Sequence, residues 1–113
     1  MNPTGQAGRR GDRVRSDCWI SFEKKADGGI SIEVTSKVES MYGESIRDTI
    51  REGLSALGID HADIVVEDAG ALPFVIAARL EAAVKRAAPD VEAEFLPEFK
   101  DHSRYGTTRE RFR

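Results

Sequence analysis

In the first third of the chain, apolar positions alternate with polar ones, a pattern typical of strands buried on one face. Two segments show it, Cys18–Phe22 and Ile30–Val34. Between them lies Asp27-Gly28-Gly29, whose residues accept the positive φ angles of tight turns. The pattern therefore predicts an antiparallel hairpin.

After the second segment the apolar positions follow at four-residue spacing, which is typical of a helix. Ser36 and Glu39 are spaced as a capping box in front of it, and Gly58 stands where a left-handed residue ends a helix. We therefore expect a helix that ends before Gly58, with an apolar stripe made of Val38, Met41, Tyr42, Ile46, Ile50, Leu54 and Leu57.

A short β-branched run, Ile64–Val66, predicts a third strand between His61 and Asp68. Pro73 suits the first turn of a second helix, and Pro89 ends that helix. The many alanines between the two prolines indicate close packing against a sheet.

This order of elements indicates the α+β class: a small ββαβα sandwich in which two helices cover one face of a three-stranded sheet. The strand–helix–strand unit over residues 30–68 favours a right-handed crossover. We expect flexible basic tails on either side of one domain: residues 1–15 form a flexible N-terminal tail, 16–100 the domain, and 101–113 a linker or flexible C-terminal tail. Within the domain, Phe95, Leu96 and Phe99 form either a last edge strand or a docking segment.

The 113 residues carry a formal net charge of −3, with arginines concentrated at the two ends and acids in the middle. An acidic body favours basic partner proteins and argues against nucleic acid as a partner. No apolar run approaches the ~20 residues that span a bilayer, and no secretory signal follows the N-terminal arginines. The single cysteine, Cys18, excludes a disulfide framework and fits a reducing compartment, so we expect a cytoplasmic protein without a membrane partner.

No catalytic or metal-binding constellation is present in the sequence. His61 and His102 lack partners at ligand spacing and are expected to be solvated, and Cys18 alternates inward and is expected to be inert. Trp19 lies on the opposite strand face, where it marks a contact surface or is covered by a tail. The arginine-rich tails act as phosphate-contacting arms or merely solubilise the chain. The residues alone thus favour a binding or carrier module over an enzyme.

Three motifs carry a family resemblance. They are Ser-Lys-Val-Glu-Ser-Met-Tyr-Gly-Glu-Ser-Ile-Arg-Asp-Thr-Ile over residues 36–50, Val-Glu-Asp-Ala-Gly-Ala-Leu over 66–72, and Ala-Arg-Leu-Glu-Ala over 78–82. In this order and register they resemble the citrate lyase acyl carrier protein (gamma subunit) family, and more distantly the acyl carrier subunit of malonate decarboxylase. The resemblance covers residues 16–88, so the domain is expected to be acyl-carrier-like.

The resemblance implies a non-catalytic carrier. Members of that family carry acetyl and citryl thioesters on a 2′-(5″-phosphoribosyl)-3′-dephospho-CoA arm, joined to a serine by a phosphodiester. Their partners are the alpha and beta subunits of the lyase and a prosthetic-group transferase. The family's modified serine precedes the first strand in a segment like Glu-Ser-Gly-Asp-Val, and here Ser16-Asp17 occupies that position without the glycine.

Ser16 is therefore the expected site of covalent attachment, and Arg13 and Arg15 are expected to position the anionic donor or the finished phosphodiester. Two other functions stay open at this point. In one, the domain is never modified and serves as an adaptor that assembles a lyase complex. In the other, the arginine-rich tails bind nucleic acid.

Overall fold

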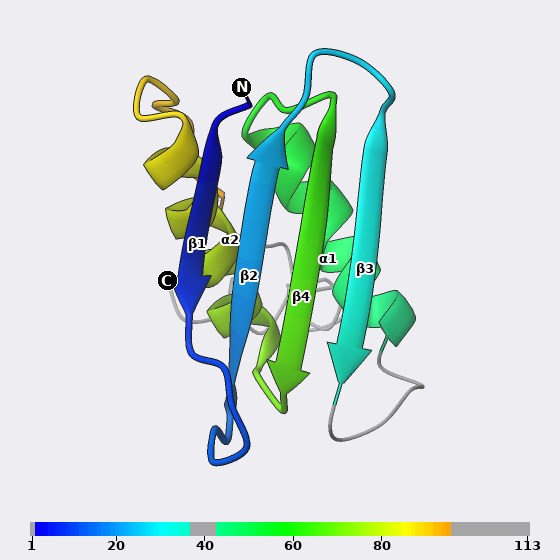
Figure 1. Cartoon of the computed structure of the whole chain (residues 1–113), viewed down its shortest axis with the longest axis vertical. Coiled ribbons are helices and arrows are strands. Elements are labelled where there is room, and N and C mark those ends of the chain that lie inside the picture. Colours follow the sequence, from blue (N-terminus) through cyan, green and yellow to red (C-terminus); the bar gives the residue numbers. More distant parts are fainter. Residues whose placement is uncertain (1, 37–42, 96–113) are drawn as a thin grey trace, which may run out of the picture.

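The computed structural model describes residues 2–36 and 43–95, which fold into one layer of strands and one layer of helices (Figure 1). The elements in chain order are β1 (Thr4–Gly8), β2 (Asp17–Lys24), β3 (Ile30–Ser36), α1 (Gly43–Ala56), β4 (Ala62–Ala69) and α2 (Pro73–Ala87).

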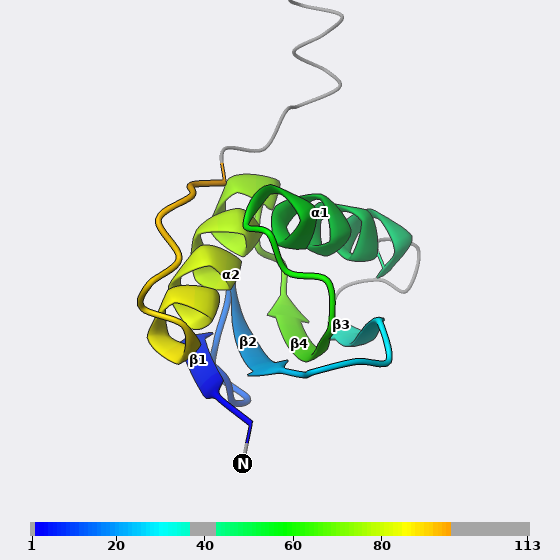
Figure 2. The ribbon, with the colours of Figure 1, turned by 90° about the horizontal axis from the view of Figure 1, so that it is seen from above.

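The strands form one mixed sheet in the order β1-β2-β4-β3, and both helices cover the same face of it (Figure 2). β2 pairs antiparallel with β1 and with β4, while β3 and β4 are parallel. Helix α2 packs on β1 and β2, and α1 packs on β3 and on α2. The predicted α+β sandwich with both helices on one face is thus confirmed, but its predicted strand count of three is wrong.

The additional strand, β1, lies in the segment that was expected to be a flexible tail, and that prediction is wrong over Thr4–Gly8. Its inward-facing residues are Gly5 and Ala7, which are buried beneath α2. Side chains this small give no hydrophobic alternation, so the sequence pattern carries no strand signal. The backbone pairing with β2 makes this segment a strand.

The predicted hairpin is also wrong, because β2 and β3 are not neighbours. β4 lies between them, and its residues Ile64 and Val66 contact both flanking strands through backbone pairing. A β-branched strand that is buried on its helix-facing side gains more from two neighbours than from one edge position. Gly28 and Gly29, with φ of 94° and 79°, make the turn that leads to the far edge of the sheet.

The end of α1 and both ends of α2 follow the sequence prediction. Gly58 has φ of 78°, its N–H donates to the carbonyl of Ser55, and the N–H of Ile59 donates to that of Leu54. These bonds are the pattern of a Schellman motif. α2 begins at Pro73 and ends at Ala87, and its C-cap residue Ala88 precedes Pro89. The predicted stripe residues Val38, Met41 and Tyr42 lie outside the described residues.

The core consists of cross-strand rows that face the helices. One row runs Ala7, Ile20, Val66 and Val34 across the sheet, and Phe22 and Ile64 stand in the next. Ile50, Leu54, Leu80 and Val84 cover these rows from the helices and are almost wholly buried. Phe95 closes the layer: it is 6% exposed, and its N–H donates to Glu81. Docking, one of the two alternatives for this segment, holds for Phe95, while Leu96 and Phe99 lie outside the described residues.

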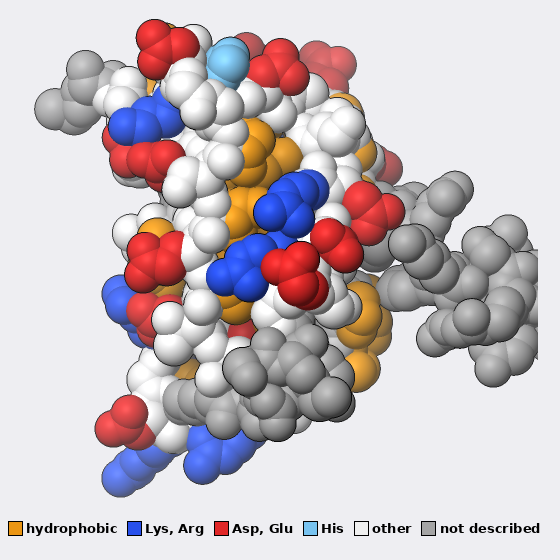
Figure 3. All heavy atoms as spheres, turned by 90° about the vertical axis from the view of Figure 1, so that its right-hand side faces the viewer, with side chains coloured by type: hydrophobic (Ala, Val, Ile, Leu, Met, Phe, Trp, Pro, Cys, Tyr) orange, Lys and Arg blue, Asp and Glu red, His pale blue; other side chains and the backbone are white. Residues whose placement is uncertain are grey.

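The edge of the sheet formed by β3 presents apolar side chains to the surface. Ile30 is 36% exposed, and Ile32 and Val34 are half-buried. Figure 3 shows hydrophobic side chains along this edge, between charged ones.

The surface of α1 carries two exposed ion pairs, Glu44 with Arg47 and Asp48 with Arg51.

Replacing Gly5 by alanine is expected to destabilise the domain. A Cβ atom on Gly5 would lie 2.1 Å from the carbonyl oxygen of Ala83 and 2.8 Å from the backbone nitrogen of Ala87, and neither backbone atom of α2 is able to turn away. We expect Gly5→Ala to lower the free energy of unfolding by about 1–3 kcal/mol, measured by urea denaturation. Gln6→Ala, which changes the exposed neighbouring side chain, serves as control. Equal stability of the two variants would contradict the close packing of β1 against α2.

Candidate functional site

Ser16 stands at the junction between the loop that follows β1 and the first residue of β2. Its φ is 58°, and it is the one described residue other than glycine with positive φ. The left-handed region costs an L-residue roughly 1–2 kcal/mol, so surrounding bonds must hold this conformation. The N–H of Ser16 donates to the carbonyl of Ala69 at 2.7 Å, and Ser16 itself is exposed. Ser16 is thus fixed through its backbone and open to solvent.

Asp17 anchors the chain immediately after Ser16. Its carboxylate accepts two hydrogen bonds from the guanidinium of Arg79 on α2, at 3.0 and 2.7 Å, and one from the N–H of Cys18 at 2.7 Å. The Asp17 side chain is only 12% exposed. The bonds from Arg79 hold the pKa of Asp17 below its usual value, although burial opposes the shift. The first residue of β2 is therefore tied to the opposite layer.

Asp68 organises the turn between β4 and α2. It is 4% exposed and accepts hydrogen bonds from the hydroxyl of Ser36 at 2.9 Å and from the N–H of Ala71 at 3.0 Å. Gly70, with φ of 89°, lets the chain turn there. The predicted capping role of Ser36 pairs it with Glu39, which lies outside the described residues. In the structure Ser36 is the last residue of β3.

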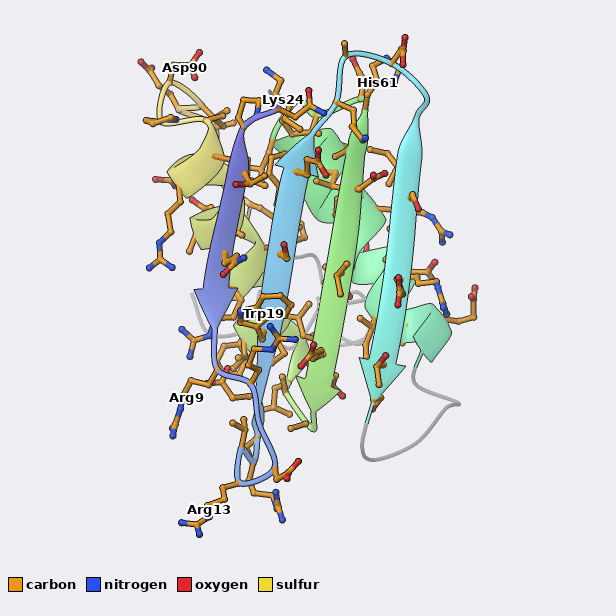
Figure 4. The ribbon with its side chains drawn as sticks, viewed as in Figure 1. Arg9, Arg13, Trp19, Lys24, His61 and Asp90 are labelled. Carbon is orange, nitrogen blue, oxygen red and sulfur yellow. The ribbon has the colours of Figure 1, made fainter. Side chains whose placement is uncertain are left out.

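The loop before Ser16 is closed on itself and carries the arginines of the N-terminal segment. Val14 is buried beneath it, and the guanidinium of Arg15 donates to the carbonyls of Asp12 and Val14. Arg13 is exposed and points away from the sheet at the tip of the loop, while Arg9 lies nearer to the strands (Figure 4). Of the two predicted positioning residues, Arg15 is thus bound to its own loop, and Arg13 faces solvent.

Trp19 lies on the open face of the sheet, which the helices do not cover (Figure 4). The guanidinium of Arg10 lies 3.9 Å from the centre of the indole ring and also forms an ion pair with Glu67. Trp19 is therefore half-covered by the N-terminal segment, as in the second of the two predicted alternatives.

The remaining candidate residues take structural roles where the structure describes them. His61 accepts a hydrogen bond from the N–H of Gly29 at 2.8 Å, so it holds a turn at the end of the sheet opposite the start of β2 (Figure 4). Cys18 is fully buried, and burial raises the pKa of its thiol to about 12, which makes it unreactive as predicted. His102 lies outside the described residues. Within residues 2–36 and 43–95, no three His, Cys, Asp or Glu side chains converge on one metal position, and no helix there has the length and apolar character to cross a membrane.

Asp68 contributes to the walls of two hollows near the end of the sheet at which β2 begins. One, of about 140 Å³, lies between the loop after β1 and the end of β4. The other, of about 480 Å³, lies between the first turns of α1 and α2.

The anchor formed by Asp17 and Arg79 was not foreseen from the sequence. Its signals are an aspartate at the first position of a strand and an arginine in the middle of an alanine-rich helix. Neither signal says that the two residues meet, because that depends on how α2 lies across β2.

Comparison with known proteins places these features in a family. A family model described as malonate decarboxylase delta subunit (MdcD), of the acyl carrier type, matches residues 7–87. The citrate lyase acyl carrier protein of Fusobacterium nucleatum is 36% identical over 88 residues, which are 78% of this chain and 94% of that protein. Proteins of the same name are 38% identical in Klebsiella pneumoniae (71% of this chain, 82% of that one) and 42% identical in Vibrio cholerae (64% and 74%). A crystal structure from Thermus thermophilus is similar with a TM-score of 0.45 and 14% identity, over 80% of this chain and 16% of that one.

Removing the charge of Asp17 is expected to change how stability depends on pH. Because Arg79 lowers the pKa of folded Asp17 below its ordinary 3.8, the ion pair stabilises the fold above that value, and this stabilisation is lost as pH falls through the lowered pKa. Arg79 keeps 37% of its side chain exposed, so solvent screens part of the interaction, and we expect Asp17→Asn to cost about 1–3 kcal/mol near neutral pH.

Urea denaturation of both proteins between about pH 7 and about pH 3 measures this difference, which is expected to shrink toward the acid end. Asp90→Asn, at an exposed position at the opposite end of the molecule, is the control and should show a small, constant difference (Figure 4). A cost of Asp17→Asn that stays unchanged from neutral to acid pH would contradict the anchoring role of the ion pair.

Proposed function

The chain belongs to the acyl carrier family described as malonate decarboxylase delta subunit, and we propose that it is the acyl carrier subunit of a citrate-lyase-like complex. The choice of lyase is supported by the relatives named citrate lyase acyl carrier protein, which share 36–42% of their residues with this chain over most of their own length. In this function the chain catalyses nothing by itself. It presents acetyl and citryl thioesters to the alpha and beta subunits of the lyase in turn.

The proposed point of attachment is Ser16, through a phosphodiester to a 2′-(5″-phosphoribosyl)-3′-dephospho-CoA arm. The observation that carries this assignment is the combination of an exposed serine and a positive φ at the first residue before β2. The residue also falls within the segment that the family model matches. An attachment residue needs an accessible hydroxyl, and it needs a backbone that a transferase meets in one conformation.

The surroundings of Ser16 suit a swinging arm. The bond from its N–H to Ala69 and the ion pair of Asp17 with Arg79 hold the backbone on both sides, so the arm would start from a rigid point. The left-handed turn takes Ser16 out of the strand ladder that begins at Asp17. In this arrangement the arm moves, while the protein backbone at its attachment point stays fixed.

The arginines of the preceding loop fit the charge of such an arm. Arg13 is exposed at the tip of this loop and is proposed to contact phosphate groups of the donor or of the finished arm. Arg15 donates to two carbonyls of its own loop, so its proposed contribution is to hold the loop and add positive charge beside Ser16. A prosthetic-group transferase is the partner that would meet these residues first.

Loss of the Ser16 hydroxyl is expected to abolish modification. When the chain is produced together with the prosthetic-group transferase of its complex, intact mass spectrometry should show the mass of the arm on the wild type and on Ser31→Ala, and the bare polypeptide mass for Ser16→Ala. Ser31 is the matched control, because it is also an exposed serine and lies in β3.

An arm that persists on Ser16→Ala would place the attachment at another residue. A wild type that stays unmodified beside an active transferase and a fully active lyase would contradict the carrier function itself. That result would favour an unmodified adaptor.

A further inference from the structure

The larger of the two hollows is a groove between the first turns of α1 and α2 and the turn that follows β4. Its volume of about 480 Å³ lies in the range of sites that hold small organic ligands. Its wall residues are Ser45, Ile46, Thr49, Asp68, Gly70, Ala71, Leu72, Pro73 and Ile76.

The groove is lined mainly by apolar groups and has a few polar ones. Ile46 and Ile76 form its inner wall and are only 4% and 3% exposed, whereas Leu72 at its rim is 58% exposed. Next to the rim, Phe74 on the first turn of α2 is 56% exposed. Large apolar side chains exposed around a hollow are typical of a binding surface. Ser45 adds a hydroxyl group that is able to bond to amides of a ligand. The hydroxyl of Thr49 donates to the carbonyl of Ser45 and is still able to accept a hydrogen bond from a ligand amide.

The groove adjoins the proposed attachment point through the end of β4. Ala69 accepts the hydrogen bond from the N–H of Ser16, and Asp17 pairs with Ala69 and bridges to Gly70. Gly70 begins the run of wall residues that continues to Pro73. A long flexible arm on Ser16 therefore starts beside this groove.

We propose that the groove holds the uncharged end of the arm, its free thiol or its acetyl thioester, while no partner subunit is engaged. This inference rests on the attachment at Ser16 proposed above. The apolar walls suit the methylene groups of the arm and an acetyl group. In hydrolysis, water adds to the thioester carbonyl and releases acetate and the free thiol, so a thioester held in the groove is shielded from that attack.

The charge of the wall selects which cargo is held. Asp68 is buried and accepts hydrogen bonds from the hydroxyl of Ser36 and the N–H of Ala71, and no ion pair joins it to a basic side chain among residues 2–36 and 43–95. A citryl group, which carries carboxylates, meets this acid and the apolar walls unfavourably. The groove thus retains the acetyl form and leaves the citryl form free for cleavage.

The reactivity of the arm's thiol toward a water-soluble aromatic disulfide reagent tests this inference, with coenzyme A in solution as the reference thiol. The protein contributes no background, because Cys18, its single cysteine, is fully buried and burial raises the pKa of its thiol to about 12. If the groove holds the thiol for nine-tenths of the time, the modified protein reacts about tenfold more slowly than coenzyme A.

Filling the groove should remove this protection. Modified Ser45→Phe and Thr49→Phe are expected to react within about twofold of coenzyme A, because their side chains occupy the site. Ser55→Phe places the same side chain on an exposed position of α1 away from the groove and should react as slowly as the wild type. Thermal unfolding of the three variants shows whether each is folded. With two groove variants, the test can still be made if one of them does not fold.

The outcomes separate this inference from the proposed function. A wild type whose mass includes the arm, but whose thiol reacts as fast as coenzyme A, would overturn the groove and leave the carrier function standing. Protection that persists in both groove-filled variants would also overturn it. A wild type without the arm in its mass would overturn both.

Discussion

The ion pair between Asp17 and Arg79 joins the two layers of the domain at the place where β2 begins. It ties the first residue of the strand to the middle of α2. The carboxylate of Asp17 also accepts a hydrogen bond from the N–H of Cys18. With Asp17 fixed on one side and the bond to Ala69 on the other, Ser16 is held in a conformation that an isolated serine rarely adopts. The anchor adjoins the groove as well, because Asp17 pairs with Ala69 and bridges to Gly70, which is part of the groove's wall.

Small residues set how closely the helices pack against the sheet and against each other. Gly5 lets α2 approach β1 so closely that its backbone nearly touches the strand. Gly53 does the same on α1, where a Cβ atom would lie 2.4 Å from a side-chain carbon of Leu80 and 2.9 Å from the ring of Phe95. The absence of a side chain at Gly5 and Gly53 therefore determines the positions of the helices as much as the large side chains of the core do.

The elements built on large periodic side chains were predictable from the sequence, and those built on small ones were not. The stripe of Ile46, Ile50 and Leu54 and the β-branched run in β4 fixed two elements in advance. β1 escaped prediction because glycine and alanine carry no hydrophobic signal. The false hairpin arose because turn residues such as Gly28 and Gly29 mark a reversal of direction but do not say which strand lies alongside.

The candidate site, too, was predictable in one part from the sequence and in another part only from the packing. Ser16 was proposed from its place in a family pattern, and its positive φ is a property of the fold that no single residue type indicates. The partner of Asp17 lies 62 positions away, so only the packing of α2 on β2 reveals it.

The rate at which the prosthetic-group transferase modifies Arg79→Gln tests most directly whether the rigid start of β2 makes Ser16 an acceptor. The variant keeps the serine and removes the guanidinium whose charge and two hydrogen bonds anchor Asp17. Near neutral pH, at a temperature where wild type and variant are both folded, we predict that initial attachment to the variant is about tenfold slower, because misplacement of a reacting group costs at least that much. Attachment at the wild-type rate would show that the anchored backbone is not what the transferase requires, and would contradict this account.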